Sequence, residues 1–324
     1  MRYLAFALLL VNSFLHAQSY PPAAGQEGST AIAAESTVFV SWATGIEVTR
    51  GLIDISDPTA EDNGSTFASY GSPEDALGVA TVNPVSLGDG GEAVLTFDTP
   101  IGNGEGFDFA VFENSFSDTF LELAFVEVSS DGTNFFRFPS HSQTQTNEQV
   151  EGFGNVDPTY INNLAGKYRA LFGTPFDLSE VPDNSLLDKN AITHIKIIDV
   201  VGSIDPEYAR YDDFGNVINE PFSTPFYSGG FDLDAVGVIN EEILAITETF
   251  TFEFKLYPNP ATTDLFISTQ GLTHIRMFDT LGRDVFSGIV TDGETIDISA
   301  LKNGIYLVQA NYNGKKLQRR VIKK

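Results

Sequence analysis

The strongest constraint on the fold is a series of short apolar segments that end at Gly, Pro, Asn or Asp. Residues 92–98, 106–113, 121–129, 192–201 and 230–240 are the clearest of them. Segments of this length with alternating or continuous apolar residues are typical of β-strands. The sequence therefore predicts an all-β fold, with a large jelly-roll-like β-sandwich over residues 18–242, named here the cargo domain.

One segment of the cargo domain favours a helix. Residues 157–172 begin with Asp157, a common N-cap residue, followed by Pro158 at the first helical position. We expect a single helix there.

Composition excludes several classes of protein. The chain has 324 residues and no cysteine, so disulfides and cysteine-ligated metals are absent. Hydrophobic residues make up 42%, enough for a packed core. The formal net charge of −26 argues against nucleic acid as a partner, because nucleic-acid binding requires a basic surface.

The charge is distributed unevenly and indicates two domains. Residues 18–253 carry 7 Lys and Arg against 38 Asp and Glu, a net charge of −31. Residues 254–324 carry 10 against 6, a net charge of +4. We predict the cargo domain at 18–242, a linker at 243–253 and a small second domain at 254–324.

The first 17 residues have the pattern of a secretory signal peptide. Arg2 precedes an apolar run at residues 4–11, and Ala17 provides a small residue before the expected cleavage site. The run is too short to span a bilayer as a helix. We expect residues 1–17 to direct export and to be removed.

The C-terminal domain contains four blocks in a specific order. They are LYPNPA at 256–261, FDTLGR at 278–283, DISALKNGIYLV at 297–308 and the basic end RRVIKK at 319–324. Short alternating segments between these blocks predict a small immunoglobulin-like β-sandwich. The blocks resemble the type A C-terminal sorting domain of the type IX secretion system in Bacteroidetes. On this resemblance the sorting motif residues are Tyr257, Pro258, Asn259, Pro260, Gly282, Gly304 and Tyr306.

The resemblance implies a destination and partners. A sorting domain of this kind implies recognition by the type IX machinery and passage across the outer membrane. Attachment to surface lipopolysaccharide, or release, would follow. The expected location is the cell surface or the extracellular space.

The cargo domain is also similar to a group of secreted bacterial surface proteins with discoidin-like or carbohydrate-binding jelly rolls. The similarity lies in SLGDGG at 86–91, FAVFEN at 109–114, FVEVSSDGTNF at 125–135 and DLDAV at 232–236. It implies a fold and leaves the ligand open.

Carboxylates at the ends of predicted strands suggest a metal site. Glu113 ends an apolar segment, Glu122 begins another, and alternation places Asp232 and Asp234 on one face of a third. Clustered like charges are unfavourable without a cation, and calcium binds such oxygen ligands. We predict that these four residues bind calcium. The alternative is that they are solvated on a strongly acidic surface.

Aromatic residues offer a candidate ligand-binding surface. The only tryptophan, Trp42, and the long loop 203–229 with Tyr211, Phe226 and Tyr227 are the candidates. Long loops of this kind are often functional. The alternative is that these rings pack the loop onto the sandwich.

The sequence thus predicts a non-enzymatic surface protein that captures a glycan or another small ligand. No catalytic residue is predicted, because the histidines are isolated and no nucleophile motif is present. Two alternatives remain. A secreted glycan hydrolase or lyase would use a pair of carboxylates, and an adhesin would bind no small ligand.

Overall fold

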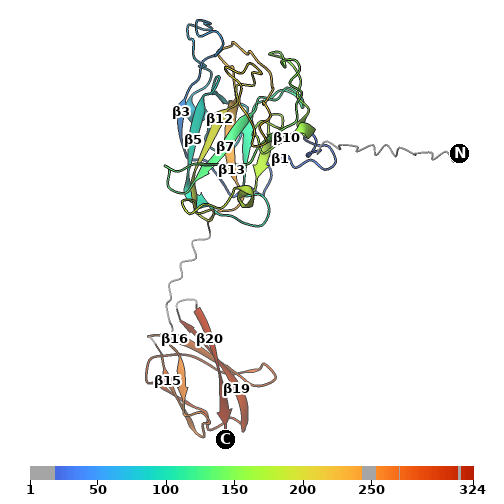
Figure 1. The fold of residues 1–324 in the computed structure, drawn as a ribbon. Coiled ribbons are helices and arrows are strands. Elements are labelled where there is room, and N and C mark those ends of the chain that lie inside the picture. The colour runs from blue at the N-terminus through green and yellow to red at the C-terminus, as the bar shows by residue number, and fades with distance from the viewer. Residues whose placement is uncertain (1–18, 243–252, 270, 313–314) are drawn as a thin grey trace, which may run out of the picture. The chain divides into compact units, whose positions relative to one another are not determined.

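The computed structural model describes residues 19–242, 253–269, 271–312 and 315–324 (Figure 1). The chain divides into two compact units, residues 1–243 and 244–324, which contain the cargo domain and the sorting domain respectively. The predicted signal peptide, and the predicted linker except for residue 253, lie outside the described residues.

The cargo domain is built from two main antiparallel sheets. The first has the order β1-β11-β6-β13-β2, with β4 paired to β13. Its strands are β1 (Ile32–Ala33), β2 (Ser41–Trp42), β4 (Val85–Ser86), β6 (Phe109–Glu113), β11 (Phe172–Phe176) and β13 (Asp232–Val238). The second has the order β3-β5-β12-β7-β8. Its strands are β3 (Gly45–Thr49), β5 (Glu92–Ile101), β7 (Ala124–Ser129), β8 (Phe136–Arg137) and β12 (Ile192–Asp199).

Both sheets contribute to one apolar core, which makes the domain a sandwich. Val111 and Val236 from the first sheet cluster with Leu95, Val126 and Ile197 from the second, and all five are buried. The outer face of β6 is covered as well, because Ala110 and Phe112 join a second cluster with Ala235. Strand β6 is therefore buried along its whole length, as a strand covered on both faces should be.

The remaining elements of the cargo domain are short. A two-stranded ladder pairs β9 (His141–Ser142) with β10 (Ile161–Asn162). Three 3-10 turns are η1 (Pro73–Ala76), η2 (Pro158–Tyr160) and η3 (Leu178–Glu180). Within the described part of the chain, no helix is long and apolar enough to cross a membrane.

The helix expected over residues 157–172 is absent, and that prediction is wrong. Asp157 caps a single 3-10 turn by accepting from Thr159 N, and the chain then enters β10. Asn163 and Gly166 have φ of 50° and 81°, which a right-handed helix does not permit. The predicted all-β sandwich is confirmed.

The sorting domain is a smaller sandwich of three- and four-stranded sheets. The orders are β14-β15-β18 and β17-β16-β19-β20. The strands are β14 (Lys255–Tyr257), β15 (Asp264–Ser268), β16 (Thr273–Phe278), β17 (Asp284–Val290), β18 (Thr295–Asp297), β19 (Gly304–Tyr312) and β20 (Lys315–Lys323). Leu265 and Ile267 from one sheet pack with Ile275, Met277 and Val308 from the other.

The first block of the sorting motif is fixed to the last strand by one side chain. The Asn259 amide donates to the carbonyl of Arg320 at 2.8 Å and accepts from the backbone N–H of Ile322 at 2.9 Å. Tyr257 stacks on Phe266, with ring centroids 5.9 Å apart. The first and last blocks of the sorting motif are thus joined by hydrogen bonds.

The other motif residues lie at turns and at the start of β19. Gly282 has a φ of 77°, and the turn that contains it is held by Asp279. Gly304 begins β19, and the Tyr306 hydroxyl donates to the carbonyl of Lys302 at 2.8 Å. Asn259 and its neighbours Pro258 and Pro260 precede β15.

Candidate metal centre

At one end of the cargo core, acidic residues lie two positions along the chain from buried core residues and share their inward-facing side. Glu113 follows Val111 by two positions, and Glu122 precedes Ala124 by two. Val111 and Ala124 are core residues, and alternate residues of an extended chain share a face. Both carboxylates are therefore directed toward the interior of the sandwich rather than toward water.

Three of the four predicted metal ligands meet at this end. One carboxylate oxygen each from Glu113, Glu122 and Asp232 lie within 4.8 Å of one another. Glu113 is 1% exposed and Glu122 is 6% exposed. The three residues come from the end of β6, from the segment before β7 and from the start of β13. We name this group the carboxylate triad.

The triad has fewer hydrogen-bond donors than its oxygens require. Glu113 Oε2 accepts from Ser115 N at 2.7 Å, but Glu113 Oε1 is buried without any partner. Asp232 accepts from the Ser86 hydroxyl. In the described part of the chain, no side-chain or backbone group donates to the Glu122 carboxylate. Leaving such groups unpaired is costly, since buried polar atoms normally have a partner.

Burial and the charges of neighbouring carboxylates raise the pKa of each triad member. Burial is the main cause for Glu113 and Glu122, whose pKa values lie well above the usual range of glutamate, and the charge of Asp232 comes next. Burial also raises the pKa of Asp232 to about 7, although the Ser86 hydroxyl and the Arg50 guanidinium oppose this. The triad therefore favours bound protons or a bound cation over three free charges.

A second group of buried acids next to the triad is bound by the backbone instead. This group contains Asp199, Glu220 and Asp89, all less than 7% exposed. Asp199 accepts three N–H bonds at 2.8–2.9 Å, Asp89 accepts one from Ile55 at 2.7 Å, and Glu220 accepts one from Leu123. These three acids connect loops, and Asp199 has both of its oxygens bound by backbone N–H groups.

The fourth predicted ligand, Asp234, is not part of the triad, although its charge raises the pKa of Glu113 and Asp232. Its carboxylate accepts from the backbone N–H groups of Thr81 and Val82 at 3.1–3.2 Å. The register of β13 against β6 shifts between Leu233 and Ala235. A bulge of this kind interrupts strict alternation, and Asp234 does not join Asp232 in the triad. The alternation expected from the sequence does not continue through this strand.

The predicted aromatic residues are not gathered into one surface. Trp42 packs against Phe39 and Phe112, with ring centroids 4.9 and 5.5 Å apart. Tyr227 contacts Tyr70 in an edge-to-face arrangement at 5.8 Å.

The other two predicted residues, Phe226 and Tyr211, have different neighbours again. Phe226 contacts Phe153 at 5.7 Å. Tyr211 is 51% exposed, and its backbone forms a bridge with Val217. The ligand-binding role assigned to the four residues remains a prediction, and their contacts give it no common site.

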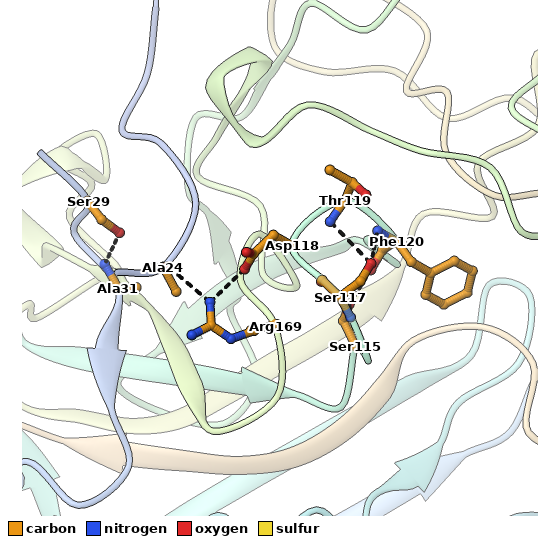
Figure 2. Close-up of polar contacts among 9 residues, drawn as sticks. All are labelled: Ala24, Ser29, Ala31, Ser115, Ser117, Asp118, Thr119, Phe120 and Arg169. Carbon is orange, nitrogen blue, oxygen red and sulfur yellow. Dashed lines mark hydrogen bonds and ion pairs between the residues drawn. The ribbon is translucent and has the colours of Figure 1, made fainter. Parts of the chain in front are cut away.

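The segment between the first two triad members is tightly held. Figure 2 shows the Arg169 guanidinium between the Asp118 carboxylate, at 2.6 Å, and the carbonyl of Ala24, at 2.9 Å. The Ser117 hydroxyl accepts from the backbone N–H of Phe120 at 2.9 Å. Residues 114–121 therefore form an ordered loop that begins at Glu113 and ends at Glu122.

Sequence reasoning did not identify the second acidic group or this loop. The alternation that places Glu113 and Glu122 inward is readable in the sequence. Glu220 lies in an irregular loop, and its proximity to Asp199 depends on long-range folding. No local pattern could have identified that contact.

Comparison with known proteins identifies the C-terminal domain. Residues 255–324 match the family model of the secretion system C-terminal sorting domain. No curated protein matches the chain significantly. The sorting domain indicates secretion by the type IX route across the outer membrane, to the cell surface or the extracellular space.

Solved structures resemble the chain only distantly. The BSP domain of a biofilm-associated protein has 9% identity and a TM-score of 0.22, over 89% of this chain and 53% of that one. A β-glucuronidase from Ruminococcus gnavus, in complex with an N1-substituted uronic isofagomine, has 9% identity and a TM-score of 0.20, over 88% and 45%. The chain spans about half the length of these structures, and neither likeness bears on function.

Proposed function

We propose that the cargo domain is a calcium-stabilised β-sandwich that captures a glycan or another small ligand outside the cell. The observation that carries the calcium part is Glu113 Oε1, which is buried, unpaired and close to two further carboxylates. On this proposal the ion replaces the missing hydrogen-bond donors. Nearby backbone carbonyls would complete its ligand shell.

The geometry of the triad suits calcium. Calcium–oxygen distances are about 2.3–2.6 Å, so oxygens bound to one ion lie at most about 5 Å apart. The triad oxygens lie within 4.8 Å of one another. All three ligands are hard oxygen donors, which calcium prefers. Magnesium usually keeps several waters of its own, and a buried group of three carboxylates offers little room for them.

The burial of the triad weighs against a hydrolase that uses these acids. A glycoside hydrolase needs two carboxyl groups facing a substrate, about 5–9.5 Å apart. Glu113 and Glu122 are almost fully enclosed, so a sugar cannot reach them without opening the core. A structural ion is therefore the better-supported role for this pair.

The sorting domain supports the location of this binding module. Delivery to the outside places the cargo domain where calcium and extracellular ligands are present. We further propose that the mature protein is retained on the surface through lipopolysaccharide, as the resemblance of the sorting domain implies.

A thermal melt of the full mature chain tests the calcium site. Trp42 is the only tryptophan, so its fluorescence reports unfolding of the cargo domain alone. Calcium at about 100 times its dissociation constant should add about 2.7 kcal/mol to the unfolding free energy. Equal melting temperatures with calcium and with chelator would refute the proposal.

The variant Glu113→Gln gives the sharpest control, because its two expected effects have opposite signs. Removing one charge should raise the melting temperature in chelator and abolish most of the rise with calcium. The matched variant Glu47→Gln changes an exposed carboxylate on β3 and should leave both values unchanged. A Glu113→Gln protein with the full calcium response would assign the ion to another site.

A further inference from the structure

We propose that a groove beside the loop 114–121 binds a neutral oligosaccharide. This inference depends on the proposed function only in treating the cargo domain as a binding module. The groove contains none of the four aromatic residues predicted from the sequence.

The groove is formed by two adjoining pockets of about 480 and 390 Å³. Both are lined by Asn155 and Asp157, which join them. These volumes are in the range of small-ligand sites. The first pocket reaches Asp118 and Thr119 of the loop 114–121, and the second reaches Thr144.

Two residues that line the second pocket each have a buried polar atom without a partner. Gln143 Oε1 and Thr144 Oγ1 are buried and form no hydrogen bond within the described residues. Both residues line that pocket. Each unpaired atom carries a desolvation cost, and rotation of its side chain toward the pocket would let a ligand hydroxyl remove that cost. A carbonyl oxygen such as Gln143 Oε1 can only accept, so the ligand must supply a donor.

The lining selects the chemical class of the ligand. Carboxamide and hydroxyl groups, including those of Gln26, Thr119, Gln145 and Asn155, accompany a larger apolar surface to which Pro22, Val150 and Val156 contribute. The polar groups can bind hydroxyls, and the apolar surface can contact the C–H faces of sugar rings. Residues 18–253 have a net charge of −31, which disfavours an anionic ligand. A neutral, hydroxyl-rich molecule fits both conditions.

Aromatic rings on the same two segments add a second surface. Phe116 and Phe153 are 72% and 70% exposed, and each stacks on Phe120, with centroids 4.4 and 6.1 Å apart. The Thr119 hydroxyl donates to Asn155 at 2.6 Å and ties the two segments together. Exposed ring faces pack against the apolar faces of sugar rings, so they extend the groove along an oligosaccharide.

Isothermal titration of the full mature chain in calcium tests this site. The probes are four neutral hexasaccharides, built of glucose, xylose, mannose and galactose. At least one should bind with a dissociation constant in the millimolar range or below. Absence of binding for all four would overturn the proposal and leave the unpaired atoms hydrated.

Two variants locate the binding. Thr144→Val removes one unpaired hydroxyl at nearly constant volume and should weaken binding about tenfold, while thermal stability is kept or raised. Asn155→Ala, which alters both pockets, should also weaken it. The control Thr133→Val changes an exposed threonine outside the groove and should bind normally. Unchanged affinity in both groove variants would place the sugar elsewhere.

The outcome is separable from the calcium hypothesis. The calcium-dependent melt is measured on the same samples without any sugar. A normal calcium shift together with no oligosaccharide binding would remove the groove proposal alone. Sugar binding without a calcium shift would remove only the metal site.

Discussion

The carboxylate triad predicts an unusual dependence of stability on pH when calcium is removed. In the unfolded chain an aspartate titrates near 3.8, and in the folded protein the pKa of Asp232 is raised to about 7. A group with a raised folded-state pKa adds stability below its unfolded value, and this stability is lost as pH rises through the folded value. Metal-free protein should therefore become less stable from about pH 4 to pH 8.

The size of this effect follows from the Asp232 pKa. A difference of one unit between the pKa in the folded state and the pKa in the unfolded state changes the free energy of unfolding by about 1.4 kcal/mol. The rise from 3.8 to about 7 thus corresponds to about 4 kcal/mol, a large part of the 5–15 kcal/mol typical of a domain. Glu113 and Glu122 have pKa values raised in the same direction, so their titration changes stability with the same sign as that of Asp232.

Urea unfolding followed by tryptophan fluorescence measures the effect in chelator and in saturating calcium at several pH values. The calcium contribution should grow as pH rises, because the ion displaces the protons held by the triad. Groups far from the site titrate equally in both series, so the difference between the series isolates the triad. A calcium contribution that is constant from pH 5 to pH 8 would refute the reasoning.

Two further predictions concern single positions. Gly202 has a φ of 79°, and a Cβ there would lie 2.3 Å from Glu220 Cγ. Gly202→Ala should therefore lower the unfolding free energy of the cargo domain by about 2–4 kcal/mol in urea, and an unchanged midpoint would contradict this. Asn259→Ala removes both hydrogen bonds to β20. It should reduce the fraction of protein outside the cell, whereas an exposed control, Thr262→Ala, should not.

The fold class was predictable because strand periodicity is local. The alternation in residues 92–98 continues into β5 (Glu92–Ile101), and its inward residues Ala93 and Leu95 are fully buried. The apolar run before Glu113 similarly becomes the doubly covered strand β6. In these segments local preference and tertiary burial favour the same conformation, so the sequence pattern is sufficient.

The helix prediction was wrong because tertiary pairing replaced a local preference. The start at Asp157 and Pro158 was interpreted correctly as a cap, but it caps only one turn. Further along, Ala165 exchanges backbone hydrogen bonds with Ala124 at 2.9 and 3.2 Å, so the chain joins the edge of a strand. Gly166 permits the turn that follows, with a φ of 81°. Pairing with β7, which is distant in sequence, therefore determines the conformation of this segment.

The candidate site was predictable only in part, for a related reason. Glu113 and Glu122 are directed inward by alternation that extends from neighbouring core residues. The same argument does not extend to Asp234, because the bulge in β13 interrupts the alternation. The aromatic candidates depended on loop conformation, which short-range patterns do not determine. Contacts such as Trp42 with Phe112 require the assembled sheet.

The buried acids also explain why the proposed cation site lies at one place in so acidic a domain. Much of the negative charge acts inside the fold, where carboxylates bind backbone N–H groups and fix loops. Asp199 accepts three such bonds, and Asp108 accepts from Gly104 and Leu178. These hydrogen bonds hold irregular loops without disulfides, but they form only where backbone N–H groups point at the carboxylate. At the triad three carboxylates meet, and Glu113 Oε1 has no donor. This domain has few lysines and arginines to compensate these carboxylates, and the proposed ion would supply the missing positive charge.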